Sequence, residues 1–359
     1  MKICIDCRMW GRQYAGIGRY TQEIVSYLLL NKKWNFVLLT SECSHNALCS
    51  FIRENNLMNV ELSKCNSNLF SIRAQIELLI RIPTCDILWV PSINVPILPV
   101  KAKKIVTTIH DVFHLAHPEY YKKWEHFILK KLISVAAKRS SIIFTVSDFS
   151  ANEIVRFYGK NIIEKIHRVY NGFNNIQFVK NYPFKERFNY LLFVGSVKPH
   201  KNLKNALLAY EKSMRTGKNL RFVIVGKRKG FVTSDHDIET IVNRININYE
   251  NVIFTGNVDD NTLYSIYASA SAFIMPSFYE GFGIPLVEAM YFHLPIICSD
   301  ISVFHEICGN QVLYFDPCNV ESICKRIEEV RDMTHRQYIP WKEWNSAGES
   351  IASIIEDNM

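Results

Sequence analysis

Short apolar runs rich in β-branched residues alternate with helical patterns along this chain, and this alternation restricts the possible folds more than any other feature. In the first half, the runs with strand character are Lys2–Asp6, Phe36–Thr40, Ile87–Val90, Ile105–Ile109 and Ile142–Val146. Helical patterns lie between them, for example Tyr20–Leu30, Trp124–Lys138 and Phe149–Tyr158. Strands that alternate with helices form a parallel sheet covered by helices. The first half is therefore predicted to be an α/β domain.

The same alternation restarts after a polar, turn-rich segment, Asn171–Pro183. The second set of strand patterns is Tyr190–Val194, Arg221–Val225, Asn251–Phe254 and Ala272–Met275. A chain of 359 residues also suits two domains, since domains usually have about 100–200 residues. We predict a first domain at residues 1–172, a linker at 173–189 and a second domain at 190–340. Ligands of such sheets bind beyond the carboxyl ends of the strands, so a cleft between the domains is expected to collect residues from both.

The bulk composition is that of a globular protein. Hydrophobic residues make up 48% of the chain and charged residues 21%, which supplies enough apolar surface to offset chain ordering. The apolar run Leu69–Ile82 is broken by charged and polar residues, and a bilayer-spanning helix needs roughly 18 uninterrupted apolar residues. The first residues lack the apolar block of a signal peptide. We expect a cytoplasmic protein.

Cysteine usage and charge restrict the partners. The ten cysteines are expected to be reduced, and the C-x-x-C pair Cys4 and Cys7 has no second pair that would complete a zinc site. Residues 1–180 carry a net charge of +11, whereas residues 181–359 carry −3. The first half is therefore expected to face an anionic membrane surface or a phosphorylated acceptor. Nucleic acid is not expected as a partner, because no recognition motif for it is present.

The first candidate junction between strand and helix contains Gly16 and Gly18. We expect these glycines in a loop directly before an amphipathic helix, where the backbone can come close to an anion at the helix start. The third glycine of the dinucleotide-binding fingerprint is missing. A tight turn without a ligand is an equal alternative.

The second candidate junction is the run that ends in His110 and Asp111. An imidazole at this position could hydrogen-bond a sugar hydroxyl, or the aspartate could hold the ring. A capped strand end is one alternative. A zinc site with His114 and His117 is another, although no helical pattern surrounds these histidines.

Two junctions in the second half carry more information. Lys201 follows a glycine turn at the entry of a helix, where its charge would add to the helix dipole and suit a diphosphate; a solvated lysine is the alternative. In Pro276–Met290, a strand ends at a proline, two glycines expose the backbone, and Glu280 and Glu288 lie on either side of the helix start. Buried carboxylates need partners, and sugar or ribose hydroxyls are suitable donors.

In this order the motifs resemble those of the family 4 retaining glycosyltransferases, especially the bacterial mannosyl- and rhamnosyl-type enzymes that build surface polysaccharides. The motifs are IDCRM, GIGRYT, TIHDVFHLAHPEY, VSDFS, VYNG, VGSVKPHKNL, VIVGK, FYEGFGIPLVEAM and WNSA. They extend over nearly the whole chain. The resemblance implies the GT-B fold, in which two Rossmann-like domains with parallel sheets face each other across a cleft. It also implies that a C-terminal helix, at about 341–359, packs back on the first domain.

The resemblance assigns the donor mainly to the second domain and the acceptor to the first. Glu288 would bind the ribose hydroxyls, Glu280 would address the transferred sugar, Lys201 would neutralise the diphosphate, and His110 would bind the sugar near the reacting carbon. His110, Glu280 and Lys201 are therefore the expected catalytic residues. The expected donor-binding residues are Gly16, Gly18, Ser196, Lys201, Lys227, Gly281, Phe282, Gly283 and Glu288.

One position departs from the family pattern. Ser196 follows the strand glycine where many relatives have an arginine as a second diphosphate cation, although a branch of the family has serine or threonine there. Lys227 is our candidate for the second cation. No metal and no cofactor are expected beyond the nucleotide sugar, since a lysine and a helix amino terminus can replace the divalent metal. The D-x-D sequence Asp235–Asp237 is predicted to be a solvated turn.

The predicted activity is retaining hexosyl transfer, with mannose and GDP-mannose favoured by resemblance. The acceptor would be a glycan or a lipid-diphosphate-linked oligosaccharide, in lipopolysaccharide O-antigen or capsule synthesis. A sugar-nucleotide epimerase of similar fold and a non-catalytic sugar-nucleotide-binding subunit are the alternatives. The basic helical segment Lys122–Arg139 could lie on the cytoplasmic face of an anionic inner membrane, or be an ordinary packed helix with a basic solvated side.

Overall fold

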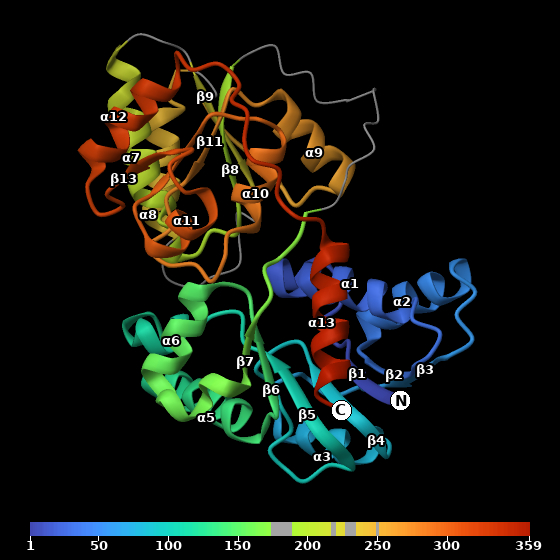
Figure 1. Ribbon diagram of the computed structural model, residues 1–359. Coiled ribbons are helices and arrows are strands. Elements are labelled where there is room, and N and C mark those ends of the chain that lie inside the picture. Colours follow the sequence, from blue (N-terminus) through green and yellow to red (C-terminus); the bar gives the residue numbers. More distant parts are fainter. Residues whose placement is uncertain (174–188, 217–219, 227–234, 249–250) are drawn as a thin grey trace. The chain divides into compact units, whose positions relative to one another are not determined.

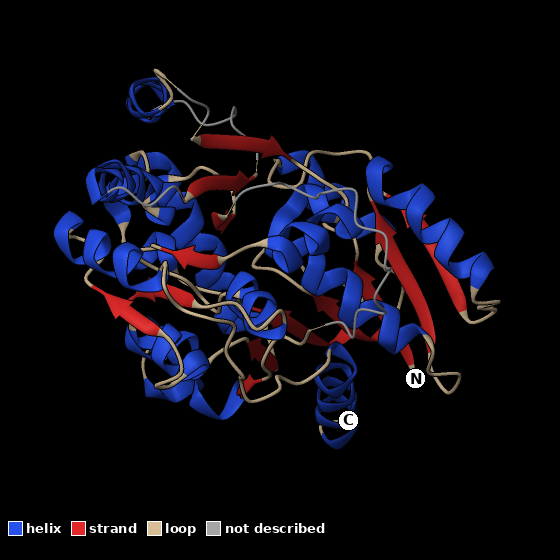
Figure 2. Ribbon diagram, turned by 90° about the horizontal axis from the view of Figure 1, so that it is seen from above, coloured by secondary structure: helices blue, strands red, loops and turns tan. Residues whose placement is uncertain are grey.

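The computed structural model describes residues 1–173, 189–216, 220–226, 235–248 and 251–359 (Figure 1). The chain divides into two compact units, the first formed by Met1–Asn174 with Lys342–Met359 and the second by Asn175–Trp341. The predicted linker lies almost wholly outside the described residues. Helices cover the strands of both sheets (Figure 2).

The first unit contains a seven-stranded sheet with the order β3-β2-β1-β4-β5-β6-β7, and every neighbouring pair is parallel. Its strands are β1 (Lys2–Asp6), β2 (Asn35–Thr40), β3 (Val60–Lys64), β4 (Cys85–Val90), β5 (Ala102–Thr108), β6 (Ile142–Thr145) and β7 (Ile166–Arg168). Its helices are α1 (Ala15–Leu29), α2 (Glu42–Glu54), α3 (Ile72–Arg81), α4 (Phe113–Ala116), α5 (Lys123–Arg139), α6 (Asp148–Tyr158) and α13 (Trp344–Asp357).

The sheet of the first unit lies between two layers of helices, as its central strand β4 shows. Successive side chains of a strand point to opposite faces of the sheet. Leu88 is buried in a cluster with Leu78 of α3 and Ala136 of α5. Trp89 faces the other way, with its ring 6.4 Å from that of Tyr20 in α1. The Tyr20 ring also lies 6.2 Å from that of Trp344 in α13. Helices α3 and α5 therefore cover one face of the sheet, and α1 and α13 the other.

Helix α1 begins earlier than the sequence pattern predicted. It starts at Ala15 rather than Tyr20, so Gly16 and Gly18 lie in its first turns and not in a preceding loop. A Cβ atom on Gly18 would come 1.9 Å from the backbone oxygen of Gly11, which is far inside van der Waals contact. Glycine at 18 thus lets the preceding loop pack on the helix. The expectation of a glycine loop was wrong.

The second unit contains a six-stranded parallel sheet with the order β10-β9-β8-β11-β12-β13. Its strands are β8 (Tyr190–Val194), β9 (Arg221–Val225), β10 (Val252–Gly256), β11 (Ala272–Met275), β12 (Ile296–Ser299) and β13 (Leu313–Phe315). Its helices are α7 (Leu203–Ser213), α8 (Asp235–Ile245), α9 (Asp260–Ser269), α10 (Ile284–Tyr291), α11 (Ser302–Cys308) and α12 (Val320–Val330). The two predicted parallel sheets are confirmed.

The core of the second unit lies between its sheet and the helices α7, α8 and α12. Leu191 of β8, Ile224 of β9 and Ile274 of β11 are fully buried against these helices. Continuous apolar strands of this kind are expected in a parallel sheet, whose two faces are both covered. This core fixes the positions of the residues that directly follow β8 and β11.

The D-x-D sequence is not a turn. Helix α8 begins at Asp235, and the carboxylate of Asp237 accepts a hydrogen bond from Lys204 Nζ at 2.7 Å. Within the described residues, no helix is both long and apolar enough to cross a membrane.

Candidate active site

The loop Pro276–Gly283 joins β11 to α10, and its carboxylate Glu280 lies beside Lys201. Lys201 ends a short 3-10 helix, Pro199–Lys201, that precedes α7. Lys201 Nζ donates a hydrogen bond to Glu280 Oε1. The hydroxyl of Ser277 donates a second hydrogen bond to the same oxygen, at 2.7 Å. Two loops of the second unit, far apart in sequence, are thus joined through one carboxylate.

The surroundings of Glu280 keep it ionised. Burial by itself would raise the pKa of this carboxyl group, but the charges of Lys201 and His200 and the hydrogen bonds from Lys201 and Ser277 lower it, and the net effect is a lowered pKa. At neutral pH the site therefore holds a carboxylate next to an ammonium group, which is an arrangement that can bind hydroxyls on one side and phosphate oxygens on the other.

Backbone contacts fix these two loops to each other. The amide of Phe278 donates to the carbonyl oxygen of His200 at 2.8 Å. Asn202 takes up a left-handed conformation, with φ +56°. Its side-chain amide donates to the carbonyl oxygens of Pro276, at 2.9 Å, and Pro317, at 2.8 Å. Asparagine adopts this conformation more readily than most residues, because its short polar side chain can bond locally.

The start of α10 is shaped by a glycine and a proline. Gly283 has φ +118° and precedes the first residue of the helix, a conformation that only glycine adopts without strain. Pro285 lies in the first turn, where its missing N–H costs no intrahelical hydrogen bond. Phe282 is buried, with its ring 5.7 Å from that of Trp341. The amino end of α10, which has orphan N–H groups and a positive dipole end, therefore begins four residues after Glu280.

Glu288, on α10, is buried, with 3% of its surface exposed. Tyr267 Oη, on α9, donates a hydrogen bond of 2.8 Å to Glu288 Oε2. The Tyr267 ring is in turn stacked on Phe292, with centroids 5.5 Å apart. A carboxylate held in this way keeps a fixed orientation without losing its capacity to accept further hydrogen bonds.

Gly195 and Gly226, which directly follow β8 and β9, lie in contact with each other. The amide of Gly195 donates to the carbonyl oxygen of Val225 at 2.9 Å. Gly226 has φ +154°, and a Cβ atom there would lie 2.0 Å from the oxygen of Gly195. Ser196 follows Gly195 at this contact. Lys227, the candidate second cation, lies outside the described residues.

In the first unit, His110 follows β5 and packs edge-on against Tyr20, with ring centroids 4.7 Å apart. Its Nε2 lies 3.1 Å from the carbonyl oxygen of Pro91. Since a carbonyl oxygen only accepts, Nε2 carries the proton and Nδ1 is the acceptor of the neutral ring. Burial lowers the pKa of His110, and the Pro91 hydrogen bond and the Asp111 charge oppose that effect only in part. The ring is therefore neutral at pH 7, and its Nδ1 can accept a hydrogen bond from a hydroxyl group.

The zinc alternative for the histidines is not supported. His117 Nδ1 lies 2.9 Å from Glu119 Oε1. Among the described residues there is no group of three or more histidine, cysteine, aspartate or glutamate side chains placed to hold a metal ion. The ten cysteines are free thiols.

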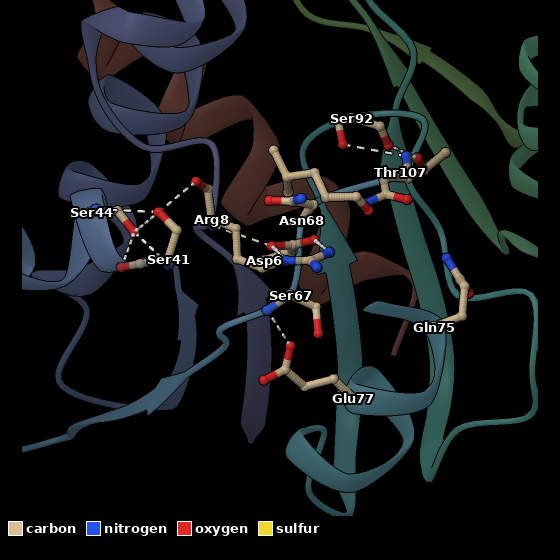
Figure 3. Close-up of polar contacts among 12 residues, drawn as sticks. Asp6, Arg8, Ser41, Ser44, Ser67, Asn68, Gln75, Glu77, Ser92 and Thr107 are labelled. Atoms are coloured by element: carbon tan, nitrogen blue, oxygen red, sulfur yellow. Dashed lines mark hydrogen bonds and ion pairs between the residues drawn. The ribbon is translucent and has the colours of Figure 1, made fainter. Parts of the chain in front are cut away.

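A buried ion pair at the end of β1 was not predicted. Arg8 donates to both carboxylate oxygens of Asp6, from Nε at 2.8 Å and from Nη2 at 2.6 Å (Figure 3). Burial alone would lower the pKa of Arg8, but Asp6 raises it, so the guanidinium stays charged. The carbonyl oxygen of Arg8 accepts a hydrogen bond from Ser41, the first residue before α2. The pair thus anchors the segment that leads to Gly11 and α1.

Comparison with known proteins places the chain in a family. The model described as "Glycosyltransferase Family 4" matches residues 14–175, and the one described as "Glycosyl transferases group 1" matches residues 175–339. The O-antigen chain mannosyltransferase RfbU of Salmonella typhimurium is 30% identical over 256 residues, which are 70% of this chain and 69% of that protein. The chain belongs to the family 4 glycosyltransferases.

A second relative is similar in sequence, and solved structures share the fold. The O-antigen chain mannosyltransferase B of Escherichia coli is 30% identical over 67% of this chain, and the match spans 65% of that protein. Sucrose-phosphate synthase from Thermosynechococcus elongatus has a TM-score of 0.76 at 13% identity, covering 99% of this chain and 98% of that one. WaaG, a glycosyltransferase involved in lipopolysaccharide biosynthesis, has a TM-score of 0.68 at 14% identity, covering 98% and 95%. The GT-B fold is confirmed.

The structure brings together some of the predicted residues of this family 4 glycosyltransferase. Lys201 and Glu280 form one group, and Gly281, Phe282 and Gly283 lead from it to the start of α10. His110, Gly16 and Gly18 belong to the first unit. Ser277 and Tyr267, which hold the two glutamates, were not predicted, because serine and tyrosine in such positions are also ordinary structural residues.

Proposed function

We propose that this chain transfers a hexose, with mannose the first candidate, from a nucleotide-diphosphate donor to a glycan or lipid-diphosphate-linked acceptor, with retention of configuration. The observation that carries the proposal is the carboxylate of Glu280, ionised and held by Lys201 and Ser277 four residues before the first residue of α10. The similarity to O-antigen mannosyltransferases supports the choice of mannose.

The donor would be bound through three groups of the second unit. Glu288, oriented by Tyr267, would accept hydrogen bonds from the two ribose hydroxyls. Glu280 and the amides of Phe282 and Gly283 would address hydroxyls of the transferred sugar. Lys201, with the positive end of the α10 dipole, would face the diphosphate.

The reaction separates charge, and these groups match the charges that develop. The bond from the anomeric carbon to the diphosphate oxygen breaks, the sugar becomes cationic, and the diphosphate gains negative charge. Lys201 and the amino end of α10 would stabilise the negative charge of the diphosphate, and Glu280 would stabilise the cationic sugar. The acceptor oxygen would bond to the anomeric carbon from the same face, and its proton would pass to a diphosphate oxygen. No metal or cofactor is part of this proposal.

The charge of the first half supports a membrane setting for the reaction. The first half carries a net charge of +11, which suits a phosphorylated, lipid-linked acceptor at an anionic membrane surface. We place the protein on the cytoplasmic side of the membrane, in lipopolysaccharide O-antigen or capsule synthesis. His110, with its Nδ1 acceptor, would bind a sugar hydroxyl.

A thermal-shift screen against UDP, GDP, ADP and dTDP sugars tests the donor class, because a ligand that binds only the folded state raises its unfolding temperature. GDP-mannose is expected to give the largest shift. Transfer is then measured with lipid-diphosphate-linked sugars, and the product's anomeric configuration is read by NMR. An α-linked product from an α-linked donor is expected.

The alternatives give different results in the same assays. An epimerase would convert the nucleotide sugar with no acceptor present, and a non-catalytic subunit would bind the donor without turnover across an acceptor panel. Lys201→Ala should slow turnover while the protein stays folded. Unchanged turnover in this variant would contradict the proposed role of Lys201.

A further inference from the structure

Helix α3 carries an apolar stripe on its solvent side. Its buried residues are Ala74 and Leu78, which face the sheet. Ile72, Ile76 and Ile80 repeat at intervals of four and so share one side of the helix. Ile72 is 83% exposed and Ile80 is 77% exposed. Packing on the sheet explains Ala74 and Leu78, but it gives no reason for three isoleucines on the opposite side.

The loop before β5 extends this stripe. Ile97 and Leu98 are both exposed. The amide of Ile97 donates to Gln75 Oε1 of α3 at 2.8 Å. Arg139, the last residue of α5, donates to the carbonyl oxygen of Leu98 at 2.8 Å. These bonds hold the loop beside the helix, and the α3 surface is defined here as Ile72, Ile76, Ile80, Ile97 and Leu98.

The charged residues of α3 are mostly basic. Arg73 and Arg81 are exposed, and they line an open hollow of about 320 Å³ together with Ile76 and Ile80. The one acidic residue of the helix, Glu77, lines the same hollow and accepts hydrogen bonds from the amides of the segment before α3, one of them from Asn66 at 2.8 Å. The two arginines outnumber this carboxylate, so the solvent side of α3 is apolar with a net positive charge.

We propose that the α3 surface docks on an anionic phospholipid bilayer, with the isoleucines inserted among the acyl chains and the arginines at the phosphates. This inference rests on the proposed lipid-linked acceptor and specifies the contact that brings the enzyme to it. A second copy of the chain fits less well. A two-fold contact presents the same patch on both copies, and here it would bring together two patches of net positive charge. An interfacial helix combines these two features, apolar residues and basic ones.

The test is binding of the full chain to vesicles. Vesicles containing phosphatidylglycerol are compared with pure phosphatidylcholine vesicles in a sedimentation assay. Binding to the anionic vesicles is expected, and it should fall as salt rises. Ile76→Asp with Ile80→Asp should weaken vesicle binding at least about tenfold, since two isoleucines inserted among acyl chains contribute more than that to the binding free energy. Arg73→Gln with Arg81→Gln should also weaken it about tenfold or more.

The matched control is Ile247→Asp, which replaces an equally exposed isoleucine of the second unit. It should bind vesicles like the unaltered chain. All the replaced side chains are exposed, so the unfolding temperatures of the variants should stay the same. The double variant Arg73→Gln with Arg81→Gln tests the α3 surface without placing a charge on an apolar site.

Three results would overturn the inference. They are no binding to anionic vesicles, equal binding by the isoleucine variant, and a dimer in light scattering that the isoleucine variant dissociates. Transfer to a detergent-solubilised acceptor is measured in parallel. Transfer without vesicle binding would refute the docking surface and leave the proposed function standing, whereas vesicle binding without transfer would do the reverse.

Discussion

Replacing Lys201 by methionine tests the carboxylate–ammonium pair at the start of α10. Methionine keeps most of the length of the side chain and removes its charge and its hydrogen bond to Glu280. The side chains of Lys201 and Glu280 are only 19% and 12% exposed, so water cannot fully replace the lost partner. Glu280 keeps the hydrogen bond from Ser277. The variant is therefore expected to be destabilised, but to fold.

The magnitude follows from the contacts that are lost. A hydrogen bond to a charged group contributes about 1.5–3 kcal/mol, so we expect the free energy of unfolding to fall by about 2 kcal/mol. In a unit of this size that lowers the unfolding temperature by about 4–8 °C. The pKa of Glu280 is lowered from its ordinary value of 4.5, so its stabilising effect is present above that value and is lost as pH falls through the folded-state pKa. The difference between variant and wild type should shrink in the same range.

The assay is urea unfolding of wild type, Lys201→Met, Glu280→Gln and the double variant. Removing both charges leaves neither one buried without a partner, so the double variant should be more stable than the sum of the single changes predicts. A coupling energy of about 1 kcal/mol or more is expected. Purely additive effects, or a difference that does not shrink in acid, would refute the reasoning.

Two further predictions concern the first unit. Gly18→Ala should lower the free energy of unfolding of the first unit by about 2 kcal/mol, because the added methyl group would meet the oxygen of Gly11. Thermal unfolding measures this loss. The control is Gly16→Ala, on the exposed side of the same turn, and it should change the stability little. A stable Gly18→Ala protein would show that the helix start can shift. The pKa of His110 lies below its ordinary value of 6.5, so kcat/KM should stay level to below pH 6.5 and then fall as the ring protonates. In His110→Asn this acid decline should be absent, and its persistence would assign it to another group.

The fold was predictable because it depends on apolar runs and their periodicity, which are visible in the sequence. Strands such as β8 and β11 are continuous apolar runs, and their alternation with helices determines a parallel sheet. The edge strand β3 was missed, since its sequence VELSK is half polar and only partly buried. The start of α1 was misplaced because the reason for Gly18 is a contact with Gly11, and no local pattern contains that contact.

The candidate site was predictable to a lesser degree. The two glutamates in the loop and helix after β11 were visible from their spacing around glycines and a proline. Their partners come from other elements: Tyr267 from α9, and Lys201 from before α7. The Asp6–Arg8 pair lies two residues apart at a strand end, and that spacing is a signal that could have been used. Its burial, however, depends on neighbouring strands and loops.

The most direct measurement is calorimetric titration of GDP-mannose into wild type, Glu288→Gln and Tyr267→Phe. Glu288→Gln removes the charge that is proposed to bind the ribose hydroxyls, and affinity should fall about tenfold or more. Tyr267→Phe removes only the hydrogen bond that orients the carboxylate, so it should bind far more tightly than Glu288→Gln. Equal affinity of wild type and Glu288→Gln would contradict the claim that the start of α10 holds a nucleotide sugar.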